Sequence, residues 1–108
     1  MPNKESYLGE LEHIVLLAIL KLKGEAYGMT VRELLETLIG REISIGALYA
    51  TTDRLERKGL ITSKKGEATA ERGGKAKRYF VVTSLGLKNL NQTRQTFEVL
   101  WSGTEVTG

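Results

Sequence analysis

The stretch of sequence that decides the fold runs from Ser44 to Thr83. It opens with Ser44-Ile45-Gly46-Ala47-Leu48-Tyr49, continues through Arg54-Leu55-Glu56-Arg57-Lys58-Gly59-Leu60-Ile61, and later reads Arg72-Gly73-Gly74-Lys75-Ala76-Lys77-Arg78-Tyr79. Ser44 suits the N-cap of a helix and Gly59 suits its end, so this spacing predicts a short helix. A strand, a basic glycine-containing loop and a second strand should follow it.

The predicted helix has a narrow inward side. Its inward residues are Ala47, Leu48 and Leu55, with Thr51 or Thr52 between them. The residues left outside are Tyr49, Ala50, Asp53, Arg54 and Arg57. The outward side is therefore small and polar.

A two-stranded hairpin is expected after this helix. One strand should run from Leu60-Ile61 through Lys65, and its partner should begin with Tyr79-Phe80-Val81-Val82. Residues 66–74 are polar and contain a Gly-Gly pair, so we expect them to form an exposed loop.

Three further helices surround this stretch. Residues 8–22 are apolar nearly all round, so this helix must be covered on most sides, and a second subunit would supply part of the cover. A second helix is expected over residues 27–39. Gly24 and Gly40 are the expected C-caps of these two helices. A last helix should start with Thr83 or Ser84 as N-cap, and the tail from residue 102 should fray.

This order of elements predicts a mainly α fold with a small β-hairpin wing. Three helices, a hairpin and a final helix correspond to a winged helix-turn-helix domain over residues 1–83. Residues 84–108 would then form a C-terminal dimerisation helix and a short tail.

The composition favours a small soluble domain. The chain has 108 residues, 41% of them hydrophobic and 27% charged, which is enough for one core. It has no cysteine, which fits a reducing cytoplasm and excludes disulfides and thiolate metal sites. The apolar run from Ile14 to Leu20 is too short to cross a membrane, and no signal peptide is evident.

Positive charge is concentrated in one part of the chain. Residues 54–79 hold nine Lys or Arg and three Glu, a balance of +6, whereas the other residues balance to −3. Such segregation indicates a polyanion as partner, although a solvated loop with scattered lysines would give the same count.

The helix beginning after Ser44 suits the recognition helix of a DNA-binding protein. Ser44 and Gly46 are small enough to let its N-terminus approach phosphates. Tyr49 could bind a phosphate or a thymine methyl, and Arg54 could bind guanine or a phosphate. The alternative is that Tyr49 is half-buried against the wing and Arg54 pairs with a neighbour such as Asp53 or Glu56.

The wing carries a second set of candidate DNA contacts. They are Arg72, Gly74, Lys75 and Lys77. The cations would give salt-dependent affinity, and the glycine would let the backbone approach DNA. The alternative is a flexible hairpin tip. A phosphate-binding P-loop is excluded because Thr69 and Ala76 stand where that motif needs Gly and Ser or Thr.

No catalytic or metal-binding constellation is expected. His13 is the only histidine and has no cysteine or second histidine to share a metal with, so we expect it at the surface or an interface. No serine has a base placed by a motif. The sequence therefore predicts no enzyme activity and no cofactor.

The last helix carries a second functional signal. Leu87, Leu90, Phe97 and Leu100 or Trp101 should share one face, and no later segment could cover the aromatic pair. Leu90, Phe97 and Trp101 are therefore expected at a dimer interface, which could also hold a small aromatic ligand. The alternative is that the pair packs on this chain's own first helix.

Several motifs of the chain occur together in one known family. They are Leu8-Gly9-Glu10-Leu11-Glu12, Ala26-Tyr27-Gly28, Ser44 through Tyr49, Arg54 through Ile61, Gly66-Glu67, Glu71 through Phe80, and Thr83. In this order, over about residues 7–87, they resemble the PadR family of transcriptional regulators.

The resemblance implies a bacterial, homodimeric winged-helix repressor that binds an inverted-repeat operator in double-stranded DNA. It implies dimerisation through the N- and C-terminal helices. By this resemblance, the recognition helix contributes Ser44, Gly46, Tyr49 and Arg54, and the wing contributes Gly74, Lys75 and Lys77. Some relatives respond to phenolic acids or bind planar drugs between subunits.

Two features depart from the family pattern. Thr52 stands where the family usually has an apolar residue, which would loosen the inward side of the recognition helix. The C-terminal region is one helix, as in the small PadR-like proteins. A different class of function stays open: a winged helix used as a protein-interaction module, with its basic wing docked on an acidic partner.

Overall fold

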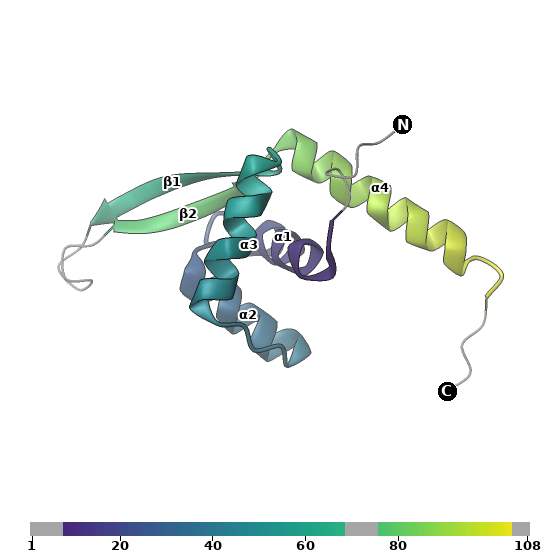
Figure 1. Cartoon of the computed structure of the whole chain (residues 1–108), viewed down its shortest axis with the longest axis horizontal. Coiled ribbons are helices and arrows are strands. Elements are labelled where there is room, and N and C mark those ends of the chain that lie inside the picture. The colour runs from purple at the N-terminus through teal and green to yellow at the C-terminus, as the bar shows by residue number, and fades with distance from the viewer. Residues whose placement is uncertain (1–7, 69–75, 105–108) are drawn as a thin grey trace.

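The computed structural model describes residues 8–68 and 76–104, in four helices and one hairpin. The elements are α1 (Glu10–Leu22), α2 (Gly28–Ile39), α3 (Ile45–Arg57), β1 (Ile61–Ala68), β2 (Ala76–Val82) and α4 (Ser84–Trp101). This is the predicted fold class: mainly α, with the two-stranded antiparallel wing between α3 and α4 (Figure 1).

The ends of α1 differ slightly from the prediction. The helix begins at Glu10 because Gly9 is extended, and the Glu12 carboxylate accepts a hydrogen bond from the Gly9 N–H at 2.9 Å. At the other end, Lys23 takes the left-handed conformation with φ 46°, so the expected C-cap at Gly24 is wrong by one residue. The Lys23 N–H closes the last turn tightly on the Leu20 carbonyl. The expected cap at Gly40 is confirmed, with φ 64°.

The start and inward side of α3 follow the sequence prediction. Ser44 caps the helix, since its side-chain oxygen accepts a hydrogen bond from the Ala47 N–H at 3.1 Å. Both Thr51 and Thr52 are fully buried between Leu48 and Leu55. The two hydroxyls stay hydrogen-bonded by donating to carbonyls of the preceding turn, that of Ala47 at 2.8 Å and that of Tyr49 at 3.1 Å. Thr52 therefore fits the core without an unpaired polar group.

The wing is longer than the sequence predicted. Gly66 lies inside β1 rather than at the start of a loop, and the ring of Tyr79 lies where a side chain at residue 66 would be. The strands pair from Ile61 opposite Val82 to Lys65 opposite Arg78, and an irregularity follows before residue 68. The Phe80 N–H donates to the Ala26 carbonyl at 2.8 Å, which ties the wing to the turn between α1 and α2.

One core joins all of these elements. It contains Val15, Leu16 and Ile19 from α1, Val31 and Leu35 from α2, Leu48 and Leu55 from α3, Ile61 and Phe80 from the wing, and Leu90 from α4. In Figure 1, the wing and α4 extend from opposite sides of the three-helix body, with principal extents of 55 × 35 × 22 Å. None of the described helices combines the length and apolar character that a membrane crossing requires.

Candidate nucleic-acid interface

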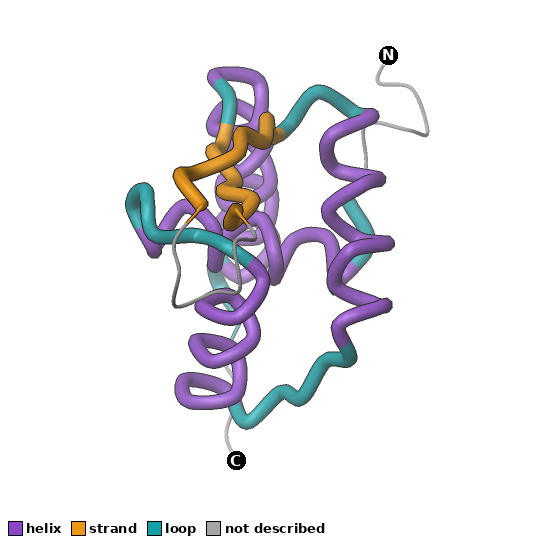
Figure 2. The backbone as a smooth tube through the Cα atoms, turned by 90° about the vertical axis from the view of Figure 1, so that its left-hand side faces the viewer, coloured by secondary structure: helices purple, strands orange, loops and turns teal. Residues whose placement is uncertain are grey.

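One side of α3 faces away from the other helices and is exposed. Successive residues of a helix are rotated by about 100°, so the side directly opposite the buried residues carries Gly46, Ala50, Asp53 and Arg57. All four are exposed. Figure 2 shows α3 along one side of the molecule, with no other helix or strand beyond it. The first two turns of this face are small, so the helix can approach a partner closely there.

Tyr49 lies at the edge of this face rather than at its centre. The side chain is 37% exposed, and its hydroxyl lies 2.9 Å from where a β-carbon on Gly28 would be. Tyr49 is thus half-covered, as the alternative interpretation expected, but by the start of α2 rather than by the wing. Its hydroxyl stands beside the N-terminal turn of α2, whose first N–H groups have no partner within the helix.

Arg54 lies at the opposite edge of the same face and is anchored to α1. Its guanidinium donates a hydrogen bond to the buried Thr51 hydroxyl at 3.2 Å, and its Nε lies 4.0 Å from the Glu12 carboxylate. The expected alternative partners Asp53 and Glu56 are not the ones it contacts. About half of the side chain remains exposed, so Arg54 can reach a ligand at this edge.

Glu12 is the buried charge that holds α1 against the end of α3. Its carboxylate accepts hydrogen bonds from Lys58 Nζ at 2.7 Å and from the Gly9 N–H. Burial acts to raise the pKa of Glu12, but these two hydrogen bonds and the charges of Lys58 and Arg54 together hold the pKa below its ordinary value of 4.5. Glu12 therefore stays ionised and fixes the position of two cations.

The base of the wing carries a tyrosine pair with a cation on it. The rings of Tyr27 and Tyr79 meet edge to face with their centroids 5.4 Å apart. Lys77 Nζ lies 4.1 Å from the centroid of the Tyr27 ring. This cation–π contact places the Lys77 charge next to the start of α2. The other three wing candidates, Arg72, Gly74 and Lys75, lie outside the described residues.

Two exposed cations were missed by the sequence prediction of the site. Arg57 lies at the centre of the free face of α3, and Lys65 lies opposite Arg78 on the face of the wing that adjoins α3. Within the described part of the chain, neither forms an ion pair. The two-residue alternation of β1 was the available signal for Lys65, since it places residues 63 and 65 on one face.

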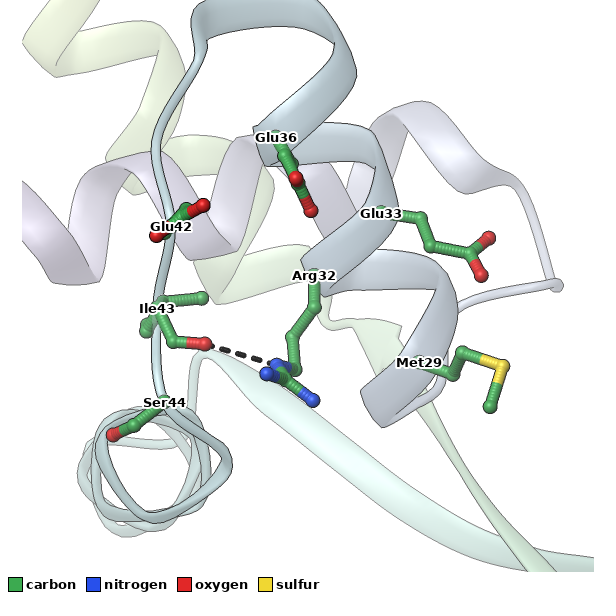
Figure 3. A pocket seen from close by; sticks show the side chains of 7 residues that line it. All are labelled: Met29, Arg32, Glu33, Glu36, Glu42, Ile43 and Ser44. Atoms are coloured by element: carbon green, nitrogen blue, oxygen red, sulfur yellow. Dashed lines mark hydrogen bonds between the residues drawn. The ribbon is translucent and has the colours of Figure 1, made fainter.

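An open groove lies beside the start of α3. Figure 3 shows that α2 and the segment leading into α3 line it with Met29, Arg32, Glu33, Glu36, Glu42, Ile43 and Ser44. Arg32 Nε donates to the Ile43 carbonyl at 2.9 Å, which fixes the turn between the two helices. With three glutamates on its walls, the groove is unfavourable for a phosphate and marks one boundary of the basic surface.

An apolar stripe runs along α4 and continues beyond the body of the chain. Leu90 is only 6% exposed and belongs to the core. Contacts within one chain therefore already bury this residue, which was expected at an interface. On the same side of the helix, Phe97, Leu100 and Trp101 are more than half exposed. The aromatic pair is therefore about half exposed in the described part of the chain.

The described residues contain no group of three His, Asp or Glu side chains that could hold a metal ion. The features gathered at the surface are instead a free helix face, exposed cations and an apolar stripe. These are features of a surface that binds macromolecules rather than of an enclosed site.

Comparison with known proteins gives one consistent result. The family model of the transcriptional regulator PadR-like family matches residues 16–92. A PadR family transcriptional regulator from Eggerthella lenta is 29% identical with a TM-score of 0.68, over 87% of this chain and 81% of its own. No curated protein sequence gave a match.

Two other solved structures share the fold at lower identity. A transcriptional regulator from Clostridium thermocellum is 24% identical with a TM-score of 0.69, over 85% of this chain and 86% of its own. A PadR-like transcriptional regulator from Bacillus cereus is 23% identical with a TM-score of 0.67, over 85% of this chain and 84% of its own.

Proposed function

Because the chain belongs to the transcriptional regulator PadR-like family, we propose that it is a homodimeric repressor that binds an inverted-repeat operator in double-stranded DNA. In this proposal α3 enters the major groove and the wing lies along the phosphate backbone. The protein works in the cytoplasm, where it reaches DNA.

The observation that carries this proposal is the free face of α3 beside a basic wing. A helix enters the major groove only where no other element covers it. The exposed face of Gly46, Ala50, Asp53 and Arg57 meets this condition except at the Asp53 carboxylate, which lies 4.0 Å from Arg78 of β2. Arg54 and Arg57 can contact bases or phosphates from this helix. Lys65 and Lys77 supply charge on the wing, and Lys75, which lies outside the described residues, is expected to add to it.

The apolar stripe of α4 supports a dimer. The side of the helix that is buried at Leu90 continues into Phe97, Leu100 and Trp101, which are more than half exposed. On α1, Leu17 and Leu20 are also exposed. A second copy of the chain would cover these side chains and would place two α3 helices in grooves about 34 Å apart.

The selection of bound sequences from random DNA tests this proposal. Repeated rounds should enrich an inverted repeat whose half-sites are centred about 10 base pairs apart or a multiple of that distance. Enrichment of no motif, together with equal binding to unrelated competitor DNA, would contradict operator recognition. Binding to an acidic protein but to no DNA would favour the interaction-module alternative.

A small aromatic ligand at the dimer interface is the finer part of the proposal. It is supported by the exposed pair of Phe97 and Trp101 on one face of α4. Trp101 is the only tryptophan, so its fluorescence reports on this surface alone. Quenching by planar aromatics that also changes DNA affinity would support the ligand site, and unchanged emission across a broad panel would exclude it.

A further inference from the structure

A cluster of four side chains joins the recognition helix to both strands of the wing. We call it the wing clamp: Asp53 and Glu56 of α3, Ser63 of β1 and Arg78 of β2. Glu56 Oε1 accepts hydrogen bonds from the Ser63 hydroxyl at 3.0 Å and from the Arg78 guanidinium at 2.9 Å. Asp53 Oδ1 lies 4.0 Å from the same guanidinium. One carboxylate thus links the helix to both strands.

The position of Arg78 is fixed from several sides. Its guanidinium carbon lies 5.6 Å from the centroid of the Phe80 ring, and Phe80 is buried in the core. On the other strand, Lys65 stands directly opposite Arg78, a pairing of like charges that destabilises a sheet unless a counter-charge is present. Glu56 supplies that counter-charge. Loss of Arg78 would remove the guanidinium that lies against both Glu56 and Asp53.

We propose that Arg78 is a positioning residue that sets the angle between the wing and α3 through Glu56, instead of neutralising a phosphate. This inference rests on the proposed DNA binding. A two-stranded hairpin has little stability of its own, so its orientation depends on contacts at its base. The clamp provides such a contact on the α3 side of the wing, and the Tyr27–Tyr79 pair provides another at its base.

The direction in which Glu56→Ala changes DNA affinity distinguishes between two possible roles of Arg78. If Arg78 bound a phosphate and Glu56 merely competed for it, Glu56→Ala would free the cation and strengthen DNA binding. If Arg78 acts through Glu56, then Glu56→Ala weakens binding by about five- to tenfold. Glu33→Ala, which removes an exposed carboxylate from α2, is the control for the general effect of losing negative charge.

A double-mutant cycle and the salt dependence complete the binding test. The loss of affinity in the Glu56→Ala/Arg78→Gln double variant should be clearly smaller than the sum of the two single losses, because both changes break the contact between Glu56 and Arg78 and only Glu56→Ala also removes the bond to Ser63. Arg78→Gln should keep the wild-type slope of log affinity against log salt, whereas loss of a phosphate contact lowers this slope by about one. Additive losses or a lowered slope would overturn the proposal.

A measurement without DNA keeps this inference separate from the proposed function. Backbone ¹⁵N relaxation of the free protein should show lower order parameters for amides of β1 and β2 in both Glu56→Ala and Arg78→Gln, with α1 unchanged. Order parameters that match the wild type in the wing would overturn the clamp. If the variants show the expected loss of order in the wing but the wild-type protein binds no DNA, the clamp is supported and the proposed function is contradicted.

Discussion

At the scale of single residues, contacts with neighbouring side chains and elements fix the side chains at both edges of the exposed face of α3. The Tyr49 hydroxyl lies close to Gly28 at the start of α2. The Arg54 guanidinium donates a hydrogen bond to Thr51 and lies near the Glu12 carboxylate. Both were predicted as outward residues of one helix, and the partners considered as alternatives were the wing for Tyr49 and Asp53 or Glu56 for Arg54. The bond between Arg54 and Thr51 lies within α3, but the contacts with Glu12 and with the start of α2 come from elements far away in the sequence, so periodicity within α3 could not indicate them.

Glu12 makes stability depend on pH in the acid range. Its pKa is lowered in the folded protein, so its contribution is present above its ordinary value of 4.5 and is lost as the pH falls through the folded value. We expect Glu12→Gln to be less stable by about 1–3 kcal/mol at pH 7, because Lys58 loses its anion. Urea unfolding between pH 3 and 7 should show a flatter acid limb for this variant.

His13 is the control for that titration. Burial lowers its pKa from 6.5, so the folded state favours the neutral ring, and stability is lost as the pH falls below about 6.5. His13→Gln should remove the part of the decline that begins below pH 6.5 and retain the part below pH 4.5. An identical pH profile for both variants would contradict these assignments.

A substitution at Gly46 should change stability and DNA affinity in opposite directions. A β-carbon there meets no atom within 4 Å, so Gly46→Ala should raise the free energy of unfolding, by up to about 1 kcal/mol. The same methyl group would stand on the free face of α3 and should weaken DNA binding. Thermal melts and DNA titrations on one sample measure both effects, and a variant that is stabilised but binds as tightly as the wild type would place the groove elsewhere.

At the scale of elements, the predicted order of helices and strands is confirmed, and the differences lie at their ends. The Ser44 cap, the Gly40 cap and the apolar spacing are local signals, and the structure agrees with them. The length of the wing is not a local property, because it depends on pairing with the other strand, where the ring of Tyr79 occupies the place of a side chain at Gly66. Leu90 was assigned to an interface because the sequence alone does not show where α4 leaves the core.

Gly86 marks the point at which α4 is fixed to the body. A β-carbon at this residue would overlap the Leu60 carbonyl oxygen, which is backbone and cannot turn aside. Gly86→Ala should therefore destabilise the protein by about 1–3 kcal/mol, and more if α4 is displaced. Thermal denaturation measures the loss. Gly46→Ala is the matched control, since the same change in a helix has space there.

At the scale of the whole molecule, the two ends of the long axis carry different elements. The wing lies at one end and the free part of α4 at the other, with the recognition helix on the body between them (Figure 1). In the proposed function, a dimer formed through α4 fixes the distance between two recognition helices. The apolar stripe and the basic surface thus depend on each other for operator binding.

If the chain dimerises through α4, substitutions on only one side of this helix should weaken the dimer. Light scattering at micromolar concentration should give about twice the chain mass of 12.0 kDa. Phe97→Ala and Trp101→Ala should shift the protein toward the monomer, because hot-spot aromatics dominate such interfaces. Val99→Ala, on the other side of the same helix, should remain dimeric. A monomeric wild type would contradict the operator geometry.

The salt dependence of DNA affinity tests the central claim most directly. The wild-type protein is titrated onto a fluorescent duplex carrying its selected sequence, at several concentrations between 50 and 200 mM potassium chloride, roughly the range in which phosphate contacts dominate. The account predicts that affinity falls steeply with salt and that Arg57→Gln binds more weakly at every concentration. An affinity that stays constant from low to high salt would contradict the assignment of α3 and the wing to DNA.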